Sequence, residues 1–84
     1  MREIFIAFRT RSQAMWFYEQ VQSYRLPAKI INTPKEAMAG CGLAVKMLYR
    51  DLNRAKIILQ RGNFSSLVGI FAILADGTIK IVMQ

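Results

Sequence analysis

The chain has 84 residues, with twelve Lys or Arg, five Asp or Glu, one cysteine and no histidine, and its formal net charge is +7. This length predicts one domain, residues 1–84, which buries only about 60 to 65% of its unfolded surface. The missing histidine and the single cysteine exclude zinc sites, Cys-His and Ser-His-Asp nucleophiles and an internal disulfide, so we expect no metal and no cofactor.

The composition also bears on compartment and partners. Residues 4–8 are too few for the apolar region of a signal peptide, which needs about 7 to 15 residues. The longest apolar run, residues 67–75, is well short of the roughly 20 residues that span a bilayer. We therefore expect a cytoplasmic protein without membrane contact, whose positive field attracts phosphates, acidic proteins or small anions.

The first half of the chain predicts two strands around one helix. The segment EIFIAF, residues 3–8, is short, apolar and rich in Ile and Phe, as is typical of a buried strand. Ser12 is placed to cap a helix over residues 13–25, in which Trp16 lies at the edge of the apolar stripe or faces solvent. The segment AKIIN, residues 28–32, predicts the second strand.

A capping motif follows the second strand. Thr33 offers a capping hydroxyl, Pro34 suits the first helical position, and Glu36 comes three residues after the cap. This pattern predicts one or two helical turns over residues 34–39, ended by Gly40 in the left-handed conformation.

The only cysteine, Cys41, is expected just after these turns. Flanking glycines leave both sides of the sulfur open to a partner, whereas the negative end of a helix disfavours a thiolate nearby. A reactive thiolate would therefore need positively charged neighbours. The flanking glycines are Gly40 and Gly42, and the candidate cations are Arg9, Lys35 and Lys46.

The second half of the chain predicts a strand, a helix and a hairpin. Residues 43–49 form the strand, and Asp51 is placed to cap a helix that Gly62 ends. Leu52, Ala55, Ile58 and Leu59 are expected on the inner face of this helix.

Two further strands complete the predicted fold. Residues 67–75 and 78–83 are joined by Asp76 and Gly77, a dipeptide that favours the type I′ hairpin turn. The first of these strands is apolar on both sides, whereas a half-solvated strand should alternate with polar residues. We expect Val68, Ile70 and Leu74 on one side, and Leu67, Phe71 and Ile73 on the other.

The element order β-α-β-β-α-β, plus one strand, predicts an α+β fold. It matches a ferredoxin-like sandwich with an extra C-terminal strand that forms a hairpin, and with both helices on one face of an antiparallel sheet. The other face would then be open and apolar, which is typical of an association surface. We therefore expect a homodimer.

The central motif also carries a family resemblance. TPKE, residues 33–36, is followed after four residues by CGLA, residues 41–44. In this pattern the chain resembles, over most of its length, the small bacterial proteins grouped as selenium/sulfur carrier-like domains.

The resemblance implies that Cys41 accepts sulfur or selenium from a donor protein as a persulfide or selenosulfide and passes it to an acceptor protein. It implies a carrier rather than a true enzyme. Ala39 and Gly40 stand where the family pattern has a serine beside the cysteine, so that hydroxyl is missing here. The supporting positions that match are Thr33, Pro34, Glu36, Gly42 and Leu43.

Other interpretations remain open. Unpaired cysteines are among the most buried residues, so Cys41 also fits a structural role in a small dimeric interaction or regulatory module. The fold order also fits an RNA-recognition module with Phe5 stacked on a base, but residues 43–49 lack the aromatic pattern, so nucleic acid ranks third. The basic residues of the second predicted helix form either a solvated face or a surface that attracts an acidic partner or phosphates. They are Arg50, Arg54, Lys56 and Arg61.

Overall fold

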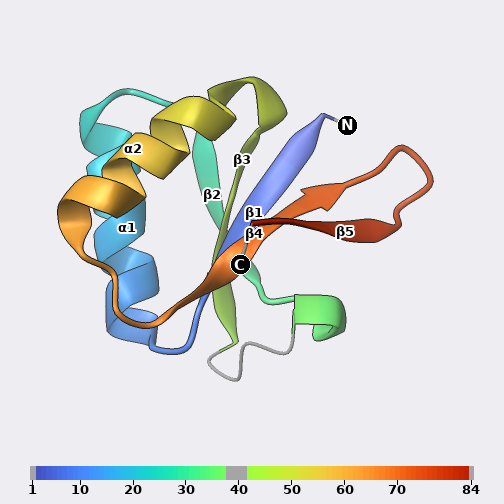
Figure 1. The fold of residues 1–84 in the computed structure, drawn as a ribbon, viewed down its shortest axis with the longest axis horizontal. Helices are drawn as coiled ribbons and strands as arrows, with labels where there is room; N and C mark the ends of the chain where they lie inside the picture. Colours follow the sequence, from blue (N-terminus) through green and yellow to red (C-terminus); the bar gives the residue numbers. More distant parts are fainter. Residues whose placement is uncertain (1, 38–41, 84) are drawn as a thin grey trace.

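The computed structural model describes residues 2–37 and 42–83, and these residues form two α helices and a five-stranded antiparallel sheet. Both helices cover one face of the sheet, and a short 3-10 segment, η1, lies on the other side (Figure 1). The strand order is β2-β3-β1-β4-β5. The elements are β1 (Glu3–Phe8), α1 (Arg11–Ser23), β2 (Ala28–Asn32), η1 (Lys35–Ala37), β3 (Leu43–Leu48), η2 (Tyr49–Asp51), α2 (Leu52–Gly62), β4 (Leu67–Ile73) and β5 (Ile79–Met83).

Strand β1 is the centre of the sheet, as its apolar sequence predicts. It pairs with β3 on one side and with β4 on the other, and every residue from Ile4 to Phe8 is buried. Because neighbouring residues of a strand point to opposite faces, this one strand supplies both apolar layers. Ile4 and Ile6 belong to the main core beneath the helices, and Phe5 belongs to a second cluster.

Helix α1 begins two residues earlier than predicted. Its cap is Thr10, whose backbone is extended and whose hydroxyl accepts a hydrogen bond from the Gln13 N–H at 3.4 Å. Ser12, the predicted cap, lies inside the first turn. The Thr10 and Ser66 hydroxyls are 3.1 Å apart, so the cap is tied to the segment before β4, and this contact favours Thr10 over Ser12.

An aromatic cluster joins α1 and β1 to the segment that follows α2. The Phe64 ring lies 5.5 Å from Phe8 and 5.6 Å from Phe17, centroid to centroid. Trp16 is 41% exposed and its ring lies 4.6 Å from that of Phe64. Trp16 therefore has the edge position that the sequence predicts, with one side packed and the other in solvent.

Helix α2 ends differently from the prediction. Asp51 precedes it but makes no capping bond with its side chain, and Asn63, with φ 53°, is the left-handed residue that ends it. Asn accepts this conformation more readily than most residues. Gly62 has another role, because a Cβ there would overlap the ring of Phe64. Of the predicted inner residues, Ala55, Ile58 and Leu59 are buried and Leu52 is partly buried.

Strand β4 distributes its residues differently from the prediction. Its register with β1 shifts between Ala7 and Phe8, so Val68 is the extra residue of a bulge. The residues before a bulge point to the opposite faces from those that strict alternation predicts. A prediction based on alternation alone therefore assigns them to the wrong face. Val68, Phe71 and Ile73 lie on the face away from the helices. Leu67 and Ile70 lie on the helix side, and Leu74 follows the end of the strand.

The sheet face away from the helices is covered at its centre, whereas Ile81 on β5, the register partner of Phe71, is 52% exposed. Phe5 is fully buried and its ring stacks on that of Phe71, 5.0 Å apart with 11° between the planes. Ala37 of η1 packs against this cluster, so the chain covers the centre of this face itself. Phe5 is therefore not available to stack on a base, and the RNA-recognition interpretation is wrong at that residue.

The turn between β4 and β5 is not the predicted type I′ turn. That turn needs a positive φ at both central residues, but Gly77 has one (87°) and Asp76 does not. The Gly77 N–H donates to the Leu74 carbonyl at 2.9 Å, and the Leu74 N–H donates to the Thr78 carbonyl at 2.8 Å. These bonds close a three-residue hairpin loop with a left-handed glycine at its third position.

Candidate functional site

The predicted site lies in the connection between β2 and β3. In Figure 1 the described ends of this connection, η1 and the start of β3, lie at the end of the sheet where β1 ends and β4 begins. Cys41 and Gly40 fall outside the described residues, as does Ala39. The site is therefore built from the residues on both sides of 38–41.

Gly42 is the described residue next to Cys41. It is exposed and its φ is 84°, a conformation that residues with a Cβ rarely adopt. A Cβ there would meet no atom within 4 Å, so the backbone angle, and not lack of space, favours glycine. The Gly42 carbonyl accepts a hydrogen bond from the Thr33 N–H at 2.9 Å. This bond closes the loop immediately beside the cysteine.

The other side of the loop differs from the predicted capping box. In the described part, the helical turns consist of η1 alone, closed by the Ala37 N–H donating to the Pro34 carbonyl at 3.0 Å. The Thr33 hydroxyl oxygen is buried and has no hydrogen-bond partner among residues 2–37 and 42–83, and Glu36 is exposed. One 3-10 turn is too short to present the N–H groups that a capping box satisfies.

Ala37 is the residue of this segment that sequence analysis missed. It is 5% exposed and packs against the cluster of Phe5 and Phe71 on the sheet. The segment before residues 38–41 is thus anchored by an apolar contact rather than by a helix cap. No local pattern indicates this role, because Phe5 and Phe71 come from strands distant in the sequence.

The three candidate cations occupy different places. Arg9 follows β1 directly, and because β1 and β3 are antiparallel neighbours, Arg9 and Gly42 lie at the same end of the sheet. Lys35 is exposed on η1. Lys46 lies four residues beyond Gly42, about 13 Å along β3, where its Nζ is 3.5 Å from a carboxylate oxygen of Glu3. Arg9 and Lys35 therefore border the loop, whereas Lys46 is engaged further along the sheet.

The start of helix α1 also lies at this end of the sheet. Thr10 and Arg11 come directly after β1, so the positive end of a thirteen-residue helix faces the same edge as Gly42. The short helix predicted before Cys41 has a dipole that opposes a thiolate, whereas the start of α1 has the opposite sign. A helix that follows a strand begins where the strand ends, and that rule could have identified the helix start and Arg11.

A polar network fixes this end of the molecule. The Gln13 side chain accepts a hydrogen bond from the Ser66 N–H at 2.8 Å and donates one to the Ser65 hydroxyl at 3.0 Å. The Arg9 N–H donates to the Ser66 carbonyl at 2.8 Å. Together with the Thr10 cap, these bonds hold the start of α1 against the segment before β4 at this end of the sheet.

The described residues offer no metal site and no membrane span. No three or more Asp or Glu side chains in residues 2–37 and 42–83 come together in a way that could hold a metal ion. None of the helices in that part of the chain is both long and apolar enough to cross a bilayer.

These features define a class: a small basic α+β protein whose only cysteine comes between β2 and β3 in the sequence. Residues 3–67, more than half of the chain, match the family described as "Putative Se/S carrier protein-like", and the chain belongs to that family. No curated protein and no solved structure matched the chain. The match covers the sheet end described above and the TPKE and CGLA motifs.

Proposed function

We propose that this protein carries sulfur or selenium between partner proteins, and that the transferred atom is bound to the Cys41 thiol. The observation that carries this proposal is the family match over residues 3–67 in a chain with one cysteine. A carrier of this kind holds its cargo on a thiol, and Cys41 is the only thiol of the chain.

The transfer is a thiol exchange. The Cys41 thiolate attacks the terminal sulfur of a donor persulfide, a new S–S bond forms on Cys41, and the donor leaves as a thiolate. An acceptor thiolate then attacks the same terminal sulfur and releases Cys41 as a thiolate. Neither step consumes an oxidant or a reductant. With selenium, a selenosulfide takes the place of the persulfide.

The surroundings of the loop support this chemistry. Gly42 puts no side chain beside the sulfur on one flank, and Arg9, Arg11 and the start of α1 supply positive charge at the same end of the sheet. Positive charge favours the thiolate form. Thr33, Pro34, Glu36 and Gly40 are proposed as the supporting loop, with Lys35 as a second cationic neighbour.

The wider assignment follows from the same proposal. We propose that residues 1–84 form one carrier domain of ferredoxin-like type, which the strand order β2-β3-β1-β4 supports, with β5 as an added edge strand. The partners are the donor and acceptor proteins. A reducing compartment such as the cytoplasm suits a thiol that must stay free between transfers.

The alternative function, a small dimeric module with a structural cysteine, relied on an open apolar sheet face. Phe5, Ala7 and Phe71 at the centre of that face are at most 2% exposed. The observation that favoured this alternative is therefore weakened, while homodimerisation stays a prediction.

The first test is the pH dependence of Cys41 alkylation. In the folded chain we expect fast reaction with iodoacetamide, and a midpoint of the rate below that of the same chain in denaturant. The physical reason is that a thiolate near Arg9 and Arg11 is favoured by their charges. Arg9→Ala combined with Arg11→Ala should move the midpoint upward, and Lys80→Ala, remote on β5, should leave it unchanged.

Persulfide loading completes the test. After incubation with glutathione persulfide, the intact mass should rise by one sulfur atom in the wild-type chain and not in Cys41→Ser. Strong protection of Cys41 from alkylation at every pH, together with no mass change, would exclude the carrier function.

A further inference from the structure

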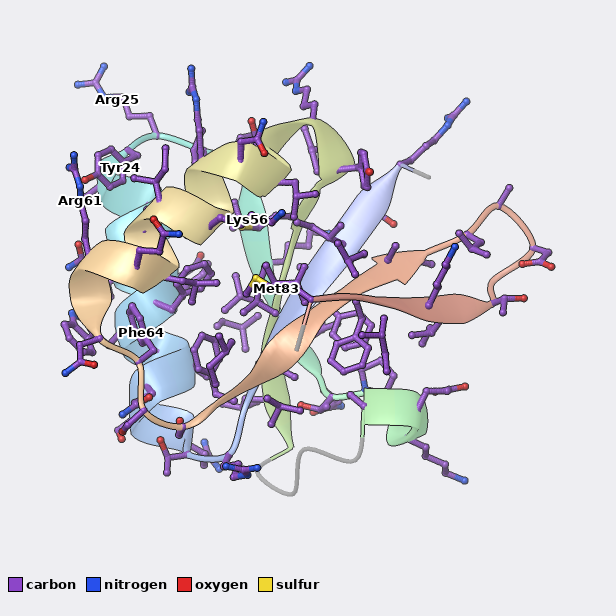
Figure 2. All side chains as sticks on the ribbon, in the orientation of Figure 1. Tyr24, Arg25, Lys56, Arg61, Phe64 and Met83 are labelled. Carbon is purple, nitrogen blue, oxygen red and sulfur yellow. The ribbon has the colours of Figure 1, made fainter. Side chains whose placement is uncertain are left out.

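A shallow groove lies between the end of α1 and helix α2, away from the loop that contains Cys41. It has a volume of about 220 Å³ and is lined by Tyr24, Arg54, Ile57, Ile58 and Arg61. Figure 2 shows the Tyr24 and Arg61 side chains close to each other at the edge of the molecule, where the end of α1 approaches α2.

The floor of the groove is apolar and exposed. Ile58 is buried at its base, whereas Ile57 is 48% exposed and Tyr24 50% exposed. These are two of the most exposed large apolar side chains among the described residues. Their position side by side leaves an apolar surface that the chain itself does not cover.

Two arginines border this apolar floor. The two arginines lie on the same stripe of α2 as the isoleucines between them. From Arg54 to Ile57 or Ile58, and from there to Arg61, the spacing is three or four residues. No acidic side chain lines the groove, and neither arginine forms an ion pair within residues 2–37 and 42–83. Both guanidinium groups are therefore free to bind a carboxylate in the two-bond geometry that arginine favours.

We propose that this groove docks an acidic segment of a partner protein. The segment places a large apolar side chain on Ile58, between Tyr24 and Ile57, and carboxylates against Arg54 and Arg61. The proposal goes beyond the carrier function, because the groove makes no use of Cys41.

A second copy of this chain does not fit the groove. Of the five acidic residues, Glu3 pairs with Lys46 and Asp51 is buried. The remaining three are separated along the chain, and a charge of +7 on each copy opposes association. They are Glu19, Glu36 and Asp76.

Nucleic acid is a poorer fit than an acidic peptide. Single strands bind to surfaces where several aromatic rings stack on successive bases. This groove has one ring, Tyr24, and its floor is made of branched aliphatic side chains, which pack well against Leu or Phe.

The position of the groove separates docking from transfer. Tyr24 follows the last residue of α1, whereas Gly42 lies at the end of the sheet where α1 begins. The thirteen residues of α1 span about 20 Å. The groove and Gly42 therefore lie toward opposite ends of α1, and docking can be measured in a Cys41→Ser chain.

The test uses a fluorescent twelve-residue amphipathic peptide with Leu at helical spacing and Glu elsewhere, and its analogue with Gln in place of Glu. Fluorescence anisotropy with the full-length Cys41→Ser chain should show binding of the Glu peptide at least tenfold tighter than the Gln peptide. Arg54→Ala with Arg61→Ala should weaken it about tenfold or more, because two charge-assisted contacts are lost. Ile57→Ser should weaken it severalfold without changing the charge.

The control separates the groove from net charge. Lys29→Ala with Lys80→Ala removes the same two charges from exposed strand positions and should weaken binding less than twofold. Equal effects of the two double variants, or no preference for the Glu peptide, would overturn the proposal. So would tighter binding of a twelve-nucleotide single-stranded RNA through Arg54 and Arg61, because the groove would then be a phosphate site. Failure of either kind leaves alkylation and persulfide loading of Cys41 unaffected.

Discussion

Gly62 is a residue at which helix propensity and the observed packing make opposite predictions. Alanine is favoured over glycine in a helix by about 1 kcal/mol, so propensity alone predicts that Gly62→Ala stabilises α2. In the structure the added Cβ would overlap the Phe64 ring, which is held between Phe8, Phe17 and Trp16. We expect Gly62→Ala to lower the free energy of unfolding by about 1 to 3 kcal/mol, measured by urea denaturation.

The double variant identifies the cause. Phe64→Leu alone removes aromatic contacts and lowers stability, but it also clears the space that a Cβ at position 62 needs. The cost of Gly62→Ala should therefore fall when Phe64 is already Leu. An equal cost in both backgrounds would show that the overlap with Phe64 is not the reason for glycine.

At the scale of elements, the strands were predicted better than the helix ends. The bounds of β1 and β2 match residues 3–8 and 28–32. The apolar run of β1 ends at Arg9, and β2 is confined between Pro27 and the Thr33-Pro34 pair. The start of α1 depends on whether Thr10 or Ser12 adopts the extended conformation. The contact with Ser66 favours Thr10, and because Ser66 lies 56 positions away in the chain, no local pattern contains it.

The candidate site shows the same division. The residues of the site could be identified from TPKE and CGLA. The contacts that hold these residues in place could not. The Thr33 hydroxyl does not cap a helix, and Ala37 anchors the segment through Phe5 and Phe71, which come from strands distant in the sequence. The bulge at Val68 likewise depends on pairing between β1 and β4. Contacts between distant elements decide these features.

The hairpin between β4 and β5 supplies a pH prediction. Two hydrogen bonds from Thr78 hold the pKa of Asp76 below its usual value of 3.8. The larger effect comes from the Thr78 hydroxyl, and the smaller one from its backbone N–H, which lies 2.9 Å from Asp76 Oδ1. A lowered pKa in the folded state means that the stabilising contribution is complete above the unfolded pKa. It is lost as the pH falls through the folded value. The Thr78 amide resonance should therefore titrate with a midpoint below 3.8 in NMR spectra.

Asp76→Asn is the control for that titration. The amide oxygen still accepts the Thr78 hydrogen bond but does not ionise, so the shift with pH should disappear while the hairpin stays formed. A wild-type midpoint at or above 3.8 would contradict the interpretation that the Thr78 hydroxyl and N–H donate hydrogen bonds to the ionised Asp76 carboxylate.

On the scale of the whole molecule, the charge of +7 predicts a salt dependence of stability. The molecule measures 31 × 26 × 19 Å, and the Debye length is about 30 Å at 0.01 M ionic strength but about 8 Å at 0.15 M. At low salt, repulsion therefore acts across the whole protein, and at physiological salt it is mostly screened. The one ion pair among the described residues, Glu3 with Lys46, is partly exposed and loses little on screening.

We therefore expect the melting temperature to rise by several degrees between 0.01 and 0.15 M NaCl, which corresponds to about 1 kcal/mol for a domain of this size. Calorimetry at pH 7 measures it. Arg50→Glu with Lys80→Glu changes two exposed positions and lowers the formal charge by two units each, from +7 to +3. Because repulsion grows steeply with net charge, that variant should respond much less to salt. A melting temperature that falls with salt in the wild-type chain would mean that local attraction, and not net repulsion, dominates its electrostatics.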